Sequence, residues 1–178
     1  MNEQLLDWIN GLAGRSGLVD GLGEFGAKDG IFVLAAVVTT FGLVELRRNF
    51  RRGLAIGVVG VAAVALSLAV AVALGQVVTE TRPFVTDGDT VKLISHGADN
   101  SFPSDHAAVA AAIAVAAALA WRKWAVVVVA LALFVGFSRV FAGVHYPGDV
   151  AAGWALGAAA AGICWFAART LAPRLAVT

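Results

Sequence analysis

The chain consists of long apolar runs separated by short polar stretches, a pattern typical of helices that cross a membrane. The runs cover about residues 30–46, 53–79, 103–121, 124–138 and 150–168. A helix needs about 20 apolar residues to cross the hydrocarbon core of a bilayer. The pattern therefore predicts about five membrane-spanning helices, of which the one at 124–138 is rather short for a full crossing.

The segment before the first run follows a different pattern. Leu5, Ile9 and Leu12 recur at helical spacing beside Trp8, and several glycines follow them. The segment lacks the basic start and the long apolar core of a signal peptide. We expect residues 3–25 to form an amphipathic helix at the membrane interface, with a re-entrant helix as the alternative.

The composition supports a membrane protein. Of the 178 residues, 60% are hydrophobic and 14% are charged, whereas soluble domains average about 45–50% apolar and about 25% charged residues. This balance argues against a soluble enzyme and excludes a disordered chain. We expect an all-α, polytopic membrane helix bundle that forms one domain over 1–178. In it, an interfacial segment at 1–29 precedes a catalytic bundle at 30–170.

The net charge of +1 hides an uneven distribution along the chain. One side of the predicted bundle carries +7 and the other side −6, if the ends of the runs alternate between the two membrane faces. The positive side contains one acid, Glu45, and these bases: Arg47, Arg48, Arg51, Arg52, Arg122, Lys123, Arg169 and Arg174. Because basic loops stay in the cytoplasm, the polar stretches 80–102 and 139–149 and all three histidines are predicted to face outward.

Three polar clusters meet at the outer ends of the runs. They contain these ionisable and hydroxyl side chains: Arg82, Ser104, Asp105, His106, Arg139, His145 and Asp149. A lone arginine or histidine at the end of a span is usually an interfacial residue. Such groups at membrane depth are costly and usually functional, so the whole set at three helix ends favours a functional site.

The residue types suit a nucleophile that is held by a carboxylate. His145 and Asp149 stand four residues apart, about one helical turn. Asp149 is able to accept a hydrogen bond from one ring nitrogen of His145, which leaves the other nitrogen free to attack.

The remaining residues suit an anionic group. Arg82 and Arg139 offer planar forks that match phosphate oxygens, and Ser104 adds donors at a helix N-terminus. His106, about one turn into that helix, is placed to give and take a proton. Together these groups predict phosphoryl transfer. A zinc site built on the histidines would leave both arginines as unexplained repulsion.

These clusters resemble the three-part signature of the type-2 phosphatidic acid phosphatase superfamily. The matching motifs are Arg82-Pro83, Pro103-Ser104-Asp105-His106 and Ser138-Arg139 followed by His145 and Asp149. Arg82-Pro83-Phe84-Val85 and Ser101-Phe102 are most similar to the bacitracin-resistance type of undecaprenyl-diphosphate phosphatase. The resemblance covers about residues 30–170.

Two positions depart from the broad superfamily pattern. Gly75 stands where the first motif has a lysine, and Asp105 stands where the second motif usually has glycine; the subgroup shares both departures. Lys92 is a candidate for the missing positive charge, although a solvated loop lysine is the more common situation. The roles of Glu80, His96, Asp99 and Asp105 stay open at this point.

The resemblance implies a metal-independent hydrolase that needs no cofactor. His145 would form a phosphohistidine, and Arg82, Ser104 and Arg139 would hold the phosphoryl oxygens. His106 would act as acid and base, and Asp149 would hold His145. The expected substrate is a polyprenyl diphosphate in the bilayer, with no nucleic acid and no obligatory protein partner. The expected location is a bacterial plasma membrane, with the site on its outer face.

Other functions fit parts of the same pattern. Phosphatidylglycerophosphate or phosphatidate hydrolysis would keep the chemistry and change the lipid. Phosphoryl transfer to a glycolipid would change only the acceptor. A small transporter or channel would place ionisable residues throughout membrane depth, whereas the middles of these apolar runs contain none.

Overall fold

The fold is all-α in the part of the chain that the computed structural model describes, residues 2–171. Arg174, which belongs to the basic side of the charge analysis, lies outside the described residues. The elements are α1 (Asn2–Asn10), α2 (Gly17–Lys28), α3 (Gly30–Arg48), α4 (Phe50–Val77), α5 (Pro83–Thr86), α6 (Asp105–Ala120), the 3-10 turn η1 (Arg122–Trp124), α7 (Ala125–Phe141) and α8 (Pro147–Leu171).

The predicted polytopic helix bundle is confirmed. Four stretches are long and apolar enough to cross a membrane: α3, α4, η1 together with α7, and α8. The fifth predicted run forms α6, an apolar helix of 16 residues. The run expected at 124–138 is longer than predicted, because the helix continues through Arg139 to Phe141.

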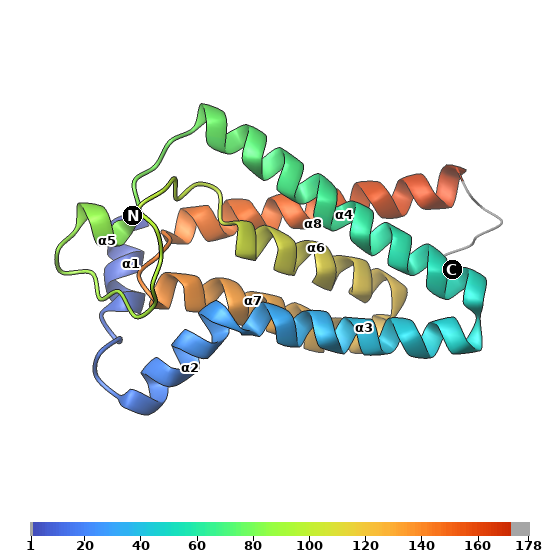
Figure 1. Cartoon of the computed structure of the whole chain (residues 1–178), viewed down its shortest axis with the longest axis horizontal. Coiled ribbons are helices and arrows are strands. Elements are labelled where there is room, and N and C mark those ends of the chain that lie inside the picture. The colour runs from blue at the N-terminus through green and yellow to red at the C-terminus, as the bar shows by residue number, and fades with distance from the viewer. Residues whose placement is uncertain (1, 172–178) are drawn as a thin grey trace.

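Helix α6 lies at the centre of the bundle and packs against α3, α4, α7 and α8 (Figure 1). Its sequence consists mostly of alanine, so neighbouring helices approach its backbone closely. Gly153 and Gly157 of α8 face this backbone, and a Cβ atom on either glycine would collide with carbonyl oxygens of Ser104 or Ala108. The glycines therefore set how closely α8 approaches the start of α6.

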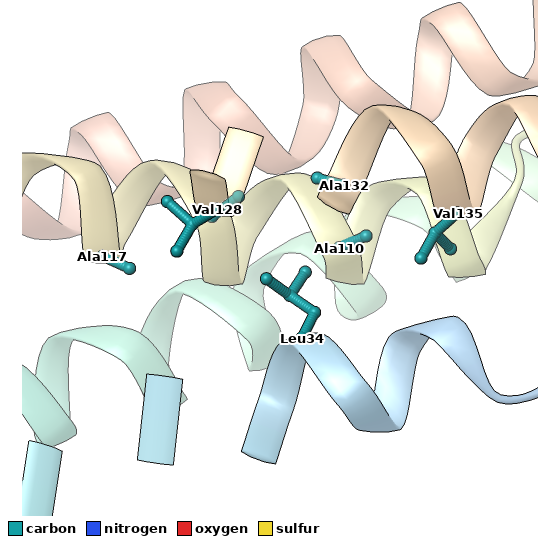
Figure 2. Close-up of a cluster of buried hydrophobic side chains, with 7 residues drawn as sticks. Leu34, Ala110, Ala117, Val128, Ala132 and Val135 are labelled. Carbon is teal, nitrogen blue, oxygen red and sulfur yellow. The ribbon is translucent and has the colours of Figure 1, made fainter. Parts of the chain in front are cut away.

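The lower layer of the bundle is held by branched side chains. Leu34 of α3 points between Ala110 of α6 and Val128 and Val135 of α7, and all four are fully buried (Figure 2). Most of the remaining surface of α3 is apolar and faces outward, as expected for a helix in contact with lipid.

The N-terminal segment is divided into two helices rather than one. The break contains Gly14, whose φ of +76° favours glycine. Helix α1 packs on α7 and α8, and α2 packs on α7. With 9 and 12 residues, neither is long enough to cross a bilayer. Trp8 and Leu18 remain 83% and 77% exposed, which fits a position at the membrane interface.

The two ends of the bundle differ in chemistry. The α3–α4 turn and the η1 turn, which carry the basic residues, lie at one end, and α1 and α5 lie at the other (Figure 1). At the basic end, Arg52 forms a 2.6 Å ion pair with Glu45 and also donates to the carbonyl oxygen of Ala120. The predicted functional residues all belong to the opposite end.

Candidate active site

The site forms where α4 ends, α6 and α8 begin and α7 ends. The segment between α4 and α6 folds back over this end, and its residue Leu93 donates a backbone hydrogen bond to Ala142, just after α7. His145 lies in the short connection between α7 and α8. This connection turns sharply at Gly143, whose φ is +73°. The chain thus brings the three predicted polar clusters together.

His145 and Asp149 are close, but their contact is long for a direct hydrogen bond. His145 Nδ1 lies 3.5 Å from Asp149 Oδ2, beyond the usual range of about 2.7–3.2 Å. His145 also precedes the first residue of α8, so the pair is not one turn of a continuous helix as the spacing suggested. The hydroxyl of Ser101 donates to the same Oδ2 atom, and the backbone N–H of Tyr146 donates to it over 2.9 Å.

The ring of His145 has a defined proton arrangement. Arg82 Nη1 lies 3.2 Å from His145 Nε2. Arginine only donates hydrogen bonds, so Nε2 accepts and the ring proton of the neutral histidine is on Nδ1. Burial lowers the pKa of His145 to about 4; the nearby carboxylate of Asp149 opposes this shift, and the positive charges of Arg139 and Arg82 add to it. His145 is therefore neutral near pH 7, with the lone pair on Nε2.

Most of the N–H groups of Arg82 donate hydrogen bonds to other protein groups. Besides His145, it donates to Asp99 Oδ1 over 2.9 Å, to the carbonyl oxygen of Val144 over 2.8 Å and to that of Asn100 over 3.1 Å. Burial acts to raise the pKa of Asp99, but the hydrogen bond and charge of Arg82 outweigh it and keep this pKa below its usual value. Asp99 is 70% exposed, so an anion from outside can compete with it for Arg82.

Arg139 and Ser104 present donors that the described residues do not satisfy. Arg139 is 2% exposed, and only its Nη1 has a partner, the carbonyl oxygen of Ala27 at 3.0 Å. Its Nε and Nη2 atoms and the hydroxyl of Ser104 are buried without a hydrogen-bond partner within residues 2–171. Buried polar groups are nearly always paired, so each of these donors is available to bind an oxyanion.

His106 and Asp105 occupy the first turn of α6, slightly earlier than the spacing suggested. His106 is partly buried and lies within electrostatic range of His145 and both arginines. The side chain of Asp105 is exposed.

The segment 87–100 adds residues whose roles the sequence left open. The ring of His96 lies 6.2 Å from that of His145, and its Nδ1 is 3.7 Å from Asp99 Oδ1. Lys92 is exposed; it donates to the carbonyl oxygen of His96 over 2.8 Å and lies 3.7 Å above the ring of Phe84. Lys92 therefore contacts His96 and Phe84 rather than the proposed phosphate site.

Asn100 lies beside Gly75, the position where the first motif has a lysine. Its side-chain nitrogen donates to the carbonyl oxygen of Gly75 over 3.0 Å, and a Cβ atom on Gly75 would lie 3.3 Å from it. Its side-chain oxygen accepts from the backbone N–H of Glu80. Burial, with the negative charge of Asp149, raises the pKa of Glu80. Asn100 thus crowds the position of a side chain at Gly75, and it connects the end of α4 to the start of the second motif.

Sequence comparisons point to one family. The family described as the PAP2 superfamily matches residues 56–172. The chain is 34% identical over 151 residues to undecaprenyl-diphosphatase BcrC of Bacillus subtilis, an alignment that covers 84% of this chain and 75% of that protein. It is also 34% identical over 158 residues to the putative undecaprenyl-diphosphatase YbjG of Escherichia coli, with 86% and 75% covered.

Two solved structures share the fold. LpxE of Aquifex aeolicus aligns with a TM-score of 0.70 at 23% identity, covering 92% of this chain and 93% of that one. The PAP2-type phosphatidylglycerolphosphate phosphatase of Bacillus subtilis aligns with a TM-score of 0.65 at 22% identity, covering 95% and 87%.

Proposed function

The chain belongs to the PAP2 superfamily as a multi-pass membrane phosphatase, and we propose that it hydrolyses undecaprenyl diphosphate to the monophosphate and phosphate. Two relatives whose names include undecaprenyl-diphosphatase align over most of this chain. The product would be the lipid carrier of cell-wall synthesis in the form that can be used again.

The observation that carries the proposal is a neutral, buried histidine beside unsatisfied donors. His145 Nε2 holds a lone pair, and Arg139 and Ser104 offer buried donors for the oxygens of a phosphoryl group. Arg82 completes this set when phosphoryl oxygens replace Asp99 and Nε2 of His145 as its acceptors, which also frees the lone pair of Nε2 for attack. Such donors act most strongly where water is excluded.

The reaction proceeds in two displacements. Nε2 of His145 attacks the terminal phosphorus, the bond from phosphorus to the bridging oxygen breaks, and its electron pair leaves with the lipid monophosphate, to which His106 gives a proton. His106 then removes a proton from water, the resulting hydroxide attacks phosphorus, and the P–N bond breaks to release phosphate. The carboxylate of Asp149 stabilises the positive ring of the phosphohistidine.

The low basicity of its leaving group makes a lipid diphosphate an easier substrate than a lipid monophosphate. A lipid monophosphate has a second pKa of about 6, whereas the alcohol that leaves a phosphate monoester is far more basic. His106 therefore contributes less to the breakdown of a diphosphate than to that of a monophosphate lipid.

We place the site on the outer face of a bacterial plasma membrane. The basic end of the bundle then lies in the cytoplasm, in agreement with the positive-inside rule. The opposite end is net acidic, so it does not attract an anionic substrate from solution. The bilayer delivers the substrate through its lipid tail, and the buried arginines capture the headgroup.

The test compares two lipids with the purified full-length protein. We expect phosphate release from undecaprenyl diphosphate to exceed that from phosphatidylglycerophosphate, to persist in EDTA and to disappear in His145→Ala. Faster release from phosphatidylglycerophosphate, the substrate class named for one structural neighbour, would replace the proposed substrate. Loss of activity in EDTA would overturn the metal-free mechanism, and full activity of His145→Ala would overturn the site.

A further inference from the structure

Ser101 occupies a position in the site that its sequence context does not suggest. It stands three residues before Ser104, and a serine before an apolar run is an ordinary candidate for a helix cap. In the structure the N-cap of α6 is Ser104. The backbone N–H of Ser101 donates to the carbonyl oxygen of Glu80 over 2.8 Å, and its side chain is fully buried. The hydroxyl is thus fixed in place without a capping role.

The hydroxyl lies between the two members of the proposed nucleophilic pair. Ser101 Oγ donates to Asp149 Oδ2 and lies 3.4 Å from His145 Nδ1. An ionised carboxylate only accepts hydrogen bonds, so the single proton of the hydroxyl points to Asp149. The lone pairs of Oγ are then available to Nδ1.

The contact of Arg82 with the His145 ring determines which ring nitrogen carries the proton. Nε2 of His145 accepts from Arg82, so Nδ1 of the neutral ring carries the proton and points it toward Oγ and Oδ2. Nδ1 lies 3.5 Å from Oδ2 of Asp149 and 3.4 Å from Oγ of Ser101, so the ring proton faces both oxygens at long hydrogen-bond distances. The hydroxyl of Ser101 contacts both Nδ1 of His145 and Oδ2 of Asp149, so it also connects these two atoms indirectly.

We infer that Ser101 is a positioning residue, whose hydroxyl links Asp149 to His145 and orients Nε2 for attack on phosphorus. This inference rests on the proposed function, since it concerns the same nucleophile. Because Asp149 polarises the hydroxyl, Oγ becomes a better acceptor for Nδ1–H. This interaction is strongest when phosphorylation makes the ring positive. It touches neither the substrate nor the reacting phosphorus.

The first experiment removes the hydroxyl. We expect Ser101→Ala to lower kcat about 10- to 100-fold, by analogy with the loss of groups that orient metal-bound histidines, and to leave KM within about twofold. Ser101→Cys, which keeps a weaker donor, should lie between Ser101→Ala and the wild type. Ser67→Ala is the matched control: Ser67 is also fully buried, but its hydroxyl donates to Val64 within α4, so kcat should not change.

The second experiment tests whether Ser101 acts through Asp149. In a double-mutant cycle, Ser101→Ala combined with Asp149→Asn should be no slower than the slower single variant, because both changes remove the same support of His145. Acid quenching of the reaction should show slower formation of the phosphoenzyme in Ser101→Ala.

Several outcomes would overturn the inference. Wild-type kcat in both Ser101 variants would exclude a role for the hydroxyl, and losses that multiply in the double variant would show that Ser101 acts independently of Asp149. A loss in KM alone would point to substrate binding instead. In each case, inactivity of His145→Ala would leave the proposed function intact, whereas activity of His145→Ala would remove both.

Discussion

Arg139 allows the proposed phosphate cluster to be tested through activity and stability at the same time. Two of its nitrogen atoms are buried without a partner in the described chain, and only Nη1 is bonded. Hydrogen bonds from a charged donor contribute about 1.5–3 kcal/mol each. Two such bonds to a bound phosphoryl group amount to about 3–6 kcal/mol, which corresponds to about 10²- to 10⁴-fold in rate.

Arg139→Gln should therefore lower kcat/KM by about 10²- to 10⁴-fold. The unliganded variant should unfold at the temperature of the wild type or above, because it no longer buries a charge with unsatisfied donors. Inorganic phosphate should raise the melting temperature of the wild type by mass action and should have little effect on the variant. Both quantities can be measured in detergent, by phosphate release and by thermal unfolding.

Arg52→Gln is the matched control at the other end of the bundle. Arg52 is satisfied by Glu45 and by the carbonyl oxygen of Ala120, so its replacement should lower stability by about 1–2 kcal/mol and leave kcat/KM unchanged. The reasoning is refuted if Arg139→Gln loses as much stability as Arg52→Gln while its kcat/KM stays within threefold of the wild type.

Three further predictions concern proton transfer and substrate delivery. His106→Ala should retain more activity on a diphosphate than on a monophosphate lipid, measured as fold-loss on each; equal losses would contradict the leaving-group argument. The pKa of His145 is lowered to about 4 by burial and by Arg139 and Arg82, against Asp149. The unfolded chain therefore takes up this proton first as pH falls, and the stability of the wild type relative to His145→Gln should be constant above pH 6.5 and decline between about 6.5 and 4. A difference that does not change down to pH 4 would show that folding does not shift the pKa of this ring. A water-soluble short-chain diphosphate should be turned over much more slowly than the lipid; equal rates would exclude delivery through the bilayer.

Most of the bundle follows from the apolar pattern, because a segment in a membrane has to satisfy its backbone within a helix. The run at 53–79 corresponds to α4, which covers Phe50–Val77 and so includes Arg51 and Arg52 of the predicted loop, and the basic turns collect at one end as the charge count indicated. Helix ends were less predictable. The fourth span continues past Ser138 because the polar side chain of Arg139 is buried inside the bundle rather than placed outside it.

The polar site was predictable only in part. Arg82, Arg139, His145 and Asp149 stand in short motifs whose spacing is visible in one sequence, and the structure brings them together. Contacts between distant segments leave no such spacing. The bond from Asn100 to Gly75 spans 25 positions and the one from Ser101 to Asp149 spans 48, so only the folded chain shows them.

The short length of α6 has a consequence for how the protein fits its bilayer. Its 16 residues extend about 24 Å at 1.5 Å per residue, whereas the hydrocarbon core is about 30 Å thick. The first turn of α6 carries His106 and follows Ser104. We expect this mismatch to place the reacting groups beneath the headgroup plane, between the longer helices α4 and α8. The thickness of the bilayer therefore determines how deep below the headgroup plane the diphosphate group has to lie to reach His145. We expect turnover to vary with the acyl-chain length of the surrounding lipid and to be highest in thin membranes.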